Sequence, residues 1–206
     1  MIVQLLKDLQ RLLCKYLFQI FNCHSLPLKE SSLVFFSYDG CTSAFSTEEM
    51  ASVSMDEIGT KKVLAVREFK RNPVCCFFIA VMEDGIGLYE IQFSNYAIRK
   101  LSYLPNEGEK FMFSDIDPSG NIYACRKSEV VIYEVVQRPL SITEISKYTL
   151  EYQISSFSIF THLNKVYALV GFWIVNSVHV IATSSWSVVN ELVSTLFIFK
   201  LIVSEF

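Results

Sequence analysis

The dipeptide Asp39-Gly40 recurs as Asp84-Gly85, 45 residues later, and each copy separates two runs of strand-forming residues. The runs beside the first copy are 33–38 and 41–45, and those beside the second are 76–81 and 86–91. An Asp-Gly pair between two such runs predicts a β-hairpin, because glycine adopts the positive φ that a tight turn requires. The same hairpin at a fixed spacing indicates a repeat.

Two further hairpins in the second half of the chain keep this spacing without the Asp-Gly pair. Ser128-Glu129 and Asn176-Ser177 each separate two runs rich in β-branched and aromatic residues. These runs are 122–127, 130–135, 166–171 and 178–181. Tyr89 and Tyr133, each in the second strand of its hairpin, are 44 residues apart. Short strands with a period of about 40 to 50 residues are typical of β-propeller blades, whereas a β-sandwich, the alternative, seldom keeps a long constant period.

The segments between the hairpins complete the repeating units. One unit opens with 63–69 and closes with 97–101. The next opens with 111–116 and closes with 142–150, and the last opens with 157–160 and closes with 186–192. The sequence therefore predicts an all-β fold, a partial WD40-like β-propeller of about three and a half blades over residues 28–206. Because closed propellers have about four to eight blades, three alternatives follow: the chain is a partial ring, copies of it associate through their open edges, or it is a fragment of a longer chain.

The first 24 residues follow a different pattern. Apolar side chains recur every three or four positions from Ile2 to Ile20, which predicts an amphipathic helix over residues 1–24. Four charges within the first fifteen residues exclude a membrane-spanning helix, and they belong to Lys7, Asp8, Arg11 and Lys15. We expect this helix to pack on protein, and the alternative is a peripheral contact with a membrane surface.

The last segment, 192–206, is nearly all apolar. Its position in the repeat predicts the opening strand of a further blade. A blade cut after one strand cannot bury its faces, which motivates the hypothesis that the chain is a shortened product without independent function.

Composition and cysteine spacing exclude several classes of function. Apolar residues make up 51% of the chain and charged residues 19%, with a net charge of -3 and no basic stripe, so we expect a folded domain that does not bind nucleic acid. The six cysteines include no Cys-x-x-Cys pair, and they are Cys14, Cys23, Cys41, Cys75, Cys76 and Cys125. Unpatterned thiols without a cleavable signal favour a reducing, cytoplasmic location. Cys75 and Cys76 are expected to face opposite sides of a strand.

The residues that could carry chemistry do not form a recognisable site. His24, His162 and His179 are far apart in the sequence, and His179 alternates with valines as a packed strand residue would. Gly85 and Gly87 are not followed by the helix that a phosphate-binding loop needs. We therefore predict no catalytic residue, no cofactor and no metal.

Two groups of acidic residues are candidate binding sites. Asp115 and Asp117 could hold a cation, but a turn over 117–120 accounts for Asp117. The acidic residues of a predicted loop would face water or a basic partner surface, and they are Glu48, Glu49, Asp56 and Glu57.

Several segments resemble one propeller family, although the Gly-His and Trp-Asp dipeptides of standard WD40 blades are missing. Between residues 31 and 190, the order and spacing of four segments are similar to the amino-terminal propeller of the vacuolar-protein-sorting eleven family, and the segments are 35–40, 67–71, 77–81 and 128–135. Members of that family are core subunits of the class C tethering complexes, HOPS and CORVET. The α-solenoid and zinc-binding RING domain of the family have no counterpart in this sequence, and no individual functional residue is carried over.

The sequence favours a non-enzymatic protein-interaction scaffold. The resemblance implies partners among tethering-complex subunits and a place in the cytoplasm, peripheral on endosomes or lysosomes. A generic WD40-like scaffold outside trafficking is the alternative within the same class. A propeller hydrolase or lyase is the alternative from another class, and it would need polar residues such as Asp115 or His162 at the central channel.

Overall fold

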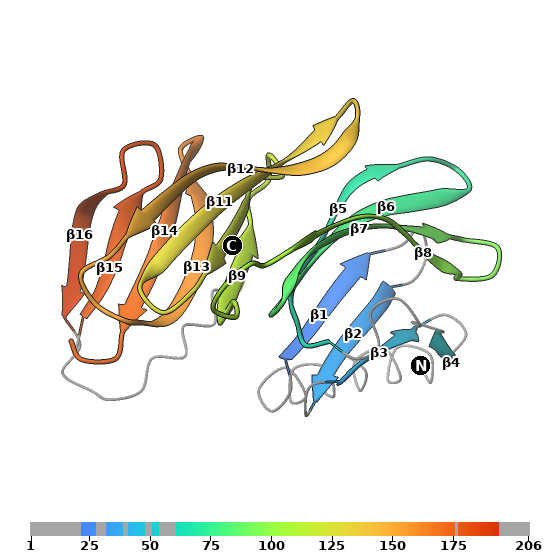
Figure 1. The fold of residues 1–206 in the computed structure, drawn as a ribbon, viewed down its shortest axis with the longest axis horizontal. Coiled ribbons are helices and arrows are strands. Elements are labelled where there is room, and N and C mark those ends of the chain that lie inside the picture. Colours follow the sequence, from blue (N-terminus) through green and yellow to red (C-terminus); the bar gives the residue numbers. More distant parts are fainter. Residues whose placement is uncertain are drawn as a thin grey trace, which may run out of the picture.

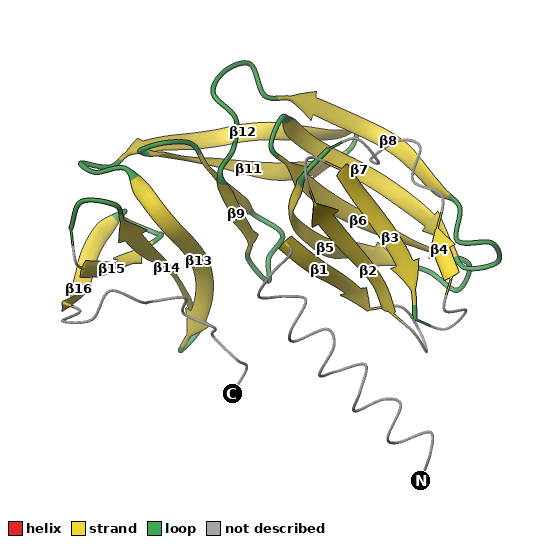
Figure 2. Ribbon diagram, turned by 90° about the horizontal axis from the view of Figure 1, so that it is seen from below, coloured by secondary structure: helices red, strands yellow, loops and turns green. Residues whose placement is uncertain are grey.

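The computed structural model describes residues 22–27, 32–38, 41–47, 51–53, 61–175 and 177–193. These residues form strands joined by loops, with no helix among them (Figure 2). The strands make four antiparallel sheets of four strands each (Figure 1). We call the sheets blades 1 to 4 in chain order.

The strands of each blade follow the chain without crossovers. Blade 1 consists of β1 (Asn22–Pro27), β2 (Ser32–Tyr38), β3 (Cys41–Ser46) and β4 (Ala51–Val53). Blade 2 consists of β5 (Val63–Arg71), β6 (Cys75–Met82), β7 (Gly85–Gln92) and β8 (Ile98–Pro105). Blade 3 consists of β9 (Phe113–Ile116), β10 (Ile122–Cys125), β11 (Glu129–Gln137) and β12 (Leu140–Thr149). Blade 4 consists of β13 (Ile154–His162), β14 (Lys165–Phe172), β15 (Ser177–Ala182) and β16 (Ser187–Val193).

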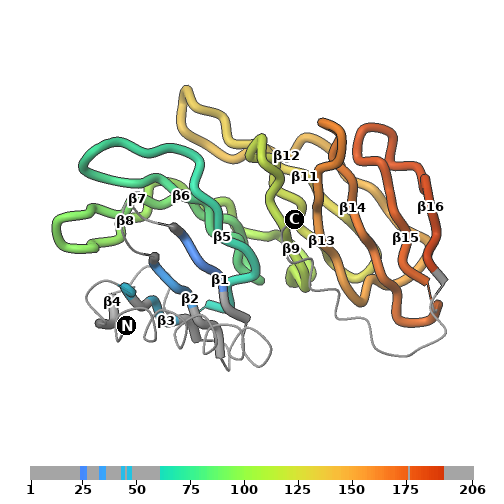
Figure 3. Tube along the Cα trace, turned by 180° about the vertical axis from the view of Figure 1, so that it is seen from behind, coloured from blue at the N-terminus to red at the C-terminus, as the bar shows by residue number. Residues whose placement is uncertain are grey.

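The blades are arranged as an arc, with the first strand of each blade on the inside. β1 contacts β5, β5 contacts β9, and β9 contacts β13, so the four innermost strands follow one another around a common axis. Blade 1 lies at one end of the arc and blade 4 at the other, both in Figure 1 and in the view from behind in Figure 3. Meandering four-stranded sheets around an axis are the architecture of a β-propeller.

The core lies between the blades and is built by the two-residue alternation of each strand. In β6, Phe78 belongs to the apolar cluster shared with blade 1, whereas its neighbour Ile79 belongs to the cluster shared with blade 3. In β10, Ile122 faces blade 2 and Tyr123 faces blade 4. Because both faces of blade 2 are covered, its second strand, β6, is apolar throughout.

Paired hydrogen bonds repeat the connection between blades at an interval of 43 or 44 residues. The amides of Asn106 and Phe111 donate to the carbonyls of Asp84 and Glu83, both at 2.8 Å. The amides of Leu150 and Ile154 donate to the carbonyls of Ser128 and Lys127, both at 2.7 Å. The segment that leads into blade 3 or 4 is therefore fixed to the turn between the second and third strands of the preceding blade.

The all-β propeller is confirmed, but the prediction of about three and a half blades is wrong. The sequence patterns identified every strand of blades 2 to 4 and missed β1 and β4. β1 begins at Asn22, so residues 22–24, predicted as the end of the helix, are strand, and the first blade starts before residue 28. The rest of the predicted helix and residues 194–206, predicted as the start of a further blade, lie outside the described residues. Among the described residues, no helix is long and apolar enough to cross a membrane.

The role predicted for glycine in the Asp84-Gly85 pair is also wrong. Met82 pairs with Gly85, so the two turn residues are Glu83 and Asp84, and Gly85 is the first residue of β7. Gly85 does not have a positive φ. In blade 1 the equivalent pair is Tyr38 with Cys41, on either side of residues 39–40, which lie outside the described residues. In a repeat of 44 residues, Asp39-Gly40 therefore aligns with Glu83-Asp84, and the second Asp-Gly pair lies one residue later in its unit.

Candidate interaction surface

The loops lie on two opposite sides of the arc, at the two ends of the strands, and one of these sides carries the connections between blades. We call it the linker end, and in blades 2 to 4 it comprises residues 83–84, 106–112, 126–128, 150–153 and 173–175. The opposite, turn end carries the other hairpin turns. Loops presented by a rigid β-scaffold are the usual location of binding residues, so both ends are candidate sites.

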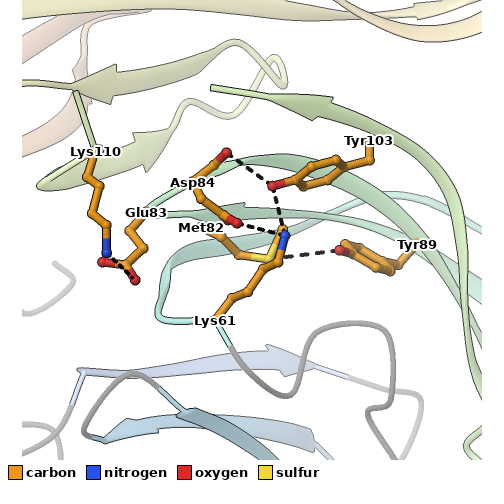
Figure 4. Close-up of polar contacts among 7 residues, drawn as sticks. All are labelled: Lys61, Met82, Glu83, Asp84, Tyr89, Tyr103 and Lys110. Carbon is orange, nitrogen blue, oxygen red and sulfur yellow. Dashed lines mark hydrogen bonds and ion pairs between the residues drawn. The ribbon is translucent and has the colours of Figure 1, made fainter. Parts of the chain in front are cut away.

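A polar cluster around Asp84 fixes the linker end of blade 2 (Figure 4). The Nζ atom of Lys61 lies 2.7 Å from Oδ2 of Asp84 and donates a hydrogen bond of 3.0 Å to the hydroxyl of Tyr103. That hydroxyl donates to the backbone carbonyl of Asp84 at 3.1 Å. Burial alone would lower the pKa of Lys61, but the hydrogen bonds to Asp84 and Tyr103 outweigh it and raise the pKa. Lys61 is therefore held as a cation that joins the start of blade 2 to its β6–β7 turn.

The other cations at the linker end are also paired. Lys110 contacts Glu83 at 3.1 Å, as Figure 4 shows, and Lys127 contacts Glu109 at 3.3 Å. Glu129 accepts from Lys147 at 2.8 Å and lies 3.8 Å from Arg126. Since each of these cations has a carboxylate partner, the linker end of blades 2 and 3 presents a mixed surface and not a basic stripe, which disfavours nucleic acid as its ligand.

The linker end of blade 4 differs because it exposes large apolar side chains. Trp173 is 66% exposed and Ile174 is 77% exposed, in the loop between β14 and β15. The amide of Trp173 donates to the carbonyl of Gln153 at 3.1 Å, which holds the start of this loop against the blade. Exposed aromatic and aliphatic side chains on an anchored loop are suited to act as contact residues for a protein partner.

A small cavity lies among the innermost strands. It has a volume of about 230 Å³ and is lined by His24 of β1, by residues 64–67 of β5 and by residues 114–116 of β9. The Nε2 atom of His24 and the Oγ atom of Ser114 are buried without a hydrogen-bond partner. Burial lowers the pKa of His24 to about 4, against the opposing effect of a hydrogen bond with the Val63 backbone. His24 is thus neutral near pH 7, and it makes no base–nucleophile pair with Ser114.

Asp115, a candidate cation ligand in the sequence, connects two blades. Its Oδ2 accepts a hydrogen bond from the amide of Ile159 at 2.7 Å and one from Oγ of Ser158 at 3.2 Å, both on β13. Its Oδ1 accepts from the amide of Ile116 at 2.8 Å. These backbone and hydroxyl donors satisfy the carboxylate, so Asp115 stabilises the contact between β9 and β13.

Asp117 has separate partners in the β9–β10 turn. It is buried, and its carboxylate accepts from the amide and the side chain of Asn121 at 2.9 and 2.8 Å, and from the hydroxyl of Tyr123 at 3.2 Å. Gly120, with a φ of 91°, completes the turn. The two aspartates do not share a site, and no group of three or more His, Cys, Asp or Glu side chains within the described residues could hold a metal ion.

The structure does not bring the three histidines together. His162 is exposed at the end of β13. His179, on β15, lies 3.6 Å from Glu191 and makes an edge contact with the ring of Phe172, with centroids 4.9 Å apart. The packed strand histidine predicted for position 179 agrees with these contacts.

The buried thiols are inert. Cys76 lies in the core shared with blade 1, Cys75 is buried beside Asn72, and Cys125 lies in the core shared with blade 4. Burial raises the pKa of the Cys76 thiol to about 12 and raises the pKa of Cys75 and of Cys125. Cys14 and the side chains of Cys23 and Cys41 lie outside the described residues.

The predicted acidic loop is interrupted by β4. This strand, Ala51–Val53, lies between the two pairs of acidic residues, which belong to the ranges 48–50 and 54–60 outside the described residues. Three residues give too weak a pattern for a strand to be recognised before its pairing with β3 is known.

The sequence patterns did not identify two features. The first is the candidate contact residues Trp173 and Ile174, and the second is the Lys61–Tyr103 pair. The signal for the first was the apolar run Phe172–Val175 at a position where the other units have polar turn residues. Lys61 and Tyr103 are 42 residues apart, and no local pattern relates them.

Comparison with known proteins identifies the fold. No protein-family model matches the chain, and no curated protein matches it. Similar solved structures include the Dos1 propeller, with a TM-score of 0.54 and 10% identity over 82% of this chain and 48% of that one. A protein from Lactobacillus plantarum matches with a TM-score of 0.57 and 12% identity over 82% of this chain and 54% of its own.

An enzyme is also among the similar structures. Dihydro-heme d1 dehydrogenase NirN in complex with DHE matches with a TM-score of 0.53 and 13% identity over 84% of this chain and 37% of that one. The chain spans about half the length of the solved structures it matches first. At such identities the likeness shows the fold alone, so the chain is a β-propeller protein and the resemblance to the vacuolar-protein-sorting eleven family stays a prediction.

Proposed function

We propose that this protein is a non-enzymatic scaffold that binds other proteins at the linker end of its propeller. The observation that carries the proposal is the exposure of Trp173 and Ile174 on an anchored loop. Tryptophan is strongly enriched among the residues that dominate binding energy at protein interfaces. The paired charges of blades 2 and 3 would form the polar rim of such a contact.

On the basis of the family resemblance, we propose that the partners are subunits of endosomal or lysosomal tethering complexes. The protein would act in the cytoplasm and on the surface of these compartments. The rigid arc would hold the Trp173 loop at a fixed position relative to blades 2 and 3. A scaffold with partners outside trafficking uses the same surface, and only the identity of the partner separates the two.

Affinity capture with matched variants tests both levels of the proposal. The double variant Trp173→Ser/Ile174→Ser should lose partners that the wild-type chain retains. Val74→Ser is the control, because Val74 is 69% exposed in the β5–β6 turn at the opposite end of the propeller. Retention of the same partners by the double variant would refute the linker-end site. Recovery of partners that include no tethering subunit would refute the trafficking role and leave the scaffold.

A further inference from the structure

Blade 4 carries the side chains of a blade–blade interface on a face that no described residue covers. In blades 2, 3 and 4, four apolar residues of the second and third strands lie on the face directed away from the preceding blade. They are Ile79, Val81, Ile86 and Leu88 in blade 2; Tyr123, Cys125, Val130 and Ile132 in blade 3; and Tyr167, Leu169, Val178 and Val180 in blade 4. Tyr123 pairs with Ile132 in blade 3, whereas in blade 4 Tyr167 pairs with Ala182 and Leu169 with Val180, so the register of β15 is shifted by two residues. All twelve residues are apolar or aromatic.

Burial separates blade 4 from the other blades at these positions. The eight residues in blades 2 and 3 are buried, because the following blade packs on them. The four residues of blade 4 are partly exposed. Tyr167 stacks on Phe160 with ring centroids 5.4 Å apart, which extends the apolar surface onto β13. The pairing of Val178 with Leu192, 48% exposed, extends it onto β16. We call these six residues the terminal face.

We infer that the terminal face binds the same face of a second copy of this chain. A blade–blade interface needs an apolar sheet as its cover, and the terminal face of another copy is such a sheet. At the described part of the far face of blade 1, Val34, which points away from the cluster shared with blade 2, is only 4% exposed and offers little surface for a head-to-tail contact. A contact in which both copies use the same face has two-fold symmetry, the commonest arrangement in soluble oligomers.

Charge and size are compatible with this contact. Among the described strand residues of blade 4, the register places one charged side chain on this face, that of Lys165 in the last pair before the β13–β14 turn. Two copies would therefore meet without strong repulsion. A four-stranded sheet, with strands about 4.8 Å apart and a rise of about 3.3 Å per residue, presents roughly 400 to 600 Å². Two such faces reach roughly the 1,000 Å² at which specific interfaces begin.

Sedimentation equilibrium of the full chain over a dilution series tests the inference. The wild-type protein should have twice the mass of one chain, which is 23.6 kDa. Leu192→Lys should have the mass of one chain, because it adds two like charges to the terminal faces. Val188→Lys should remain a dimer. Val188 is 52% exposed on the same strand, but it pairs with Ile181 and belongs to the opposite face of the sheet.

Thermal melting of each variant separates loss of association from loss of folding. Leu192 and Val188 are both about half exposed, so both variants should melt cooperatively. A second substitution on the terminal face, Val180→Lys, should dissociate the dimer as well. A monomeric wild-type chain at every concentration would overturn the inference and indicate a different cover for this face. A Leu192→Lys variant that folds and dimerises as well as the wild type would also overturn it.

Discussion

A Cβ atom at Gly85 would lie 2.5 Å from the hydroxyl oxygen of Tyr103. The backbone carbonyl oxygen of Leu104 would be at the same distance. Both residues belong to β8, which pairs with β7 at Gly85. Glycine is thus required at the start of β7 for the close approach of its neighbour strand, and not for a special backbone conformation.

We predict that Gly85→Ala destabilises the protein by about 1–3 kcal/mol, the usual cost of overpacking. Adding Tyr103→Ala should not restore stability, since the carbonyl of Leu104 cannot move out of the sheet and the hydrogen bonds of Tyr103 with Lys61 and Asp84 are lost. Gly108→Ala is the control, because its nearest neighbour, the Arg126 side chain, would be 3.7 Å from the new Cβ. Urea denaturation measures all three free energies of unfolding. Equal values for Gly85→Ala and Gly108→Ala would contradict the role of close packing.

The second prediction concerns the carboxylate that joins blades 3 and 4. Asp115→Ala leaves the amide of Ile159 without its acceptor, and we expect a loss of about 1–3 kcal/mol. Asp115→Asn retains one acceptor oxygen and should lose less. Glu144→Ala, on the exposed side of β12, serves as the control. Hydrogen exchange at Ile159 should accelerate in the alanine variant, and unchanged protection there would argue against this connection.

The third prediction is a dependence of stability on pH that comes from His24. Its pKa is about 4 in the folded protein, against 6.5 for a histidine in the unfolded chain. The unfolded chain therefore binds the proton first as the pH falls. The stabilising contribution of neutral His24 is complete above pH 6.5 and is lost progressively as the pH falls towards 4, by at most about 1.4 kcal/mol per pH unit.

Urea titrations between these pH values measure this effect. His24→Gln should flatten the dependence of the free energy of unfolding on pH by up to one proton, because it removes the group whose pKa is lowered on folding. A slope that is the same in His24→Gln and wild type would show that His24 is accessible to protons in the folded state.

The fourth prediction is a stabilising substitution at the β13–β14 turn. Leu163 and Asn164 have φ values of 48° and 60°, in the left-handed region that suits asparagine and glycine. Leu163 is 82% exposed, so its side chain contributes little packing. Leu163→Asn should therefore raise the free energy of unfolding by about 0.5 to 1 kcal/mol. Leu140→Asn, at the first residue of β12 and without positive φ, should not, and a similar gain at both positions would point to a general effect of polarity.

The sequence predicted blades 2 to 4 well because their strands carry the information locally. Both faces of a middle blade are buried, so runs such as 76–81 are continuously apolar and recur at a spacing of 44 residues. β1 lacks this signal, since Asn22, His24 and Pro27 are poor strand formers. It becomes a strand because Leu26 fits the core shared with blade 2 and because β2 supplies its hydrogen-bond partners.

The candidate site was less predictable than the fold. The exposure of Trp173 depends on which segments pack at the linker end of blade 4, and the salt bridge of Lys61 with Asp84 depends on how the segment before β5 meets the β6–β7 turn. Asp115 resembled a cation ligand because of its neighbour Asp117, but β13, more than forty residues away in the chain, supplies its partners.

The sequence by itself determined the strands, their period and the apolar character of each blade face, because alternation and turns depend on neighbouring residues. Only the tertiary structure decided which of these faces are covered. Tyr123 and Tyr167 are equivalent in the repeat, and the first is buried while the second is partly exposed. Burial depends on which blade lies beside a face, and side-chain identity alone does not contain that information.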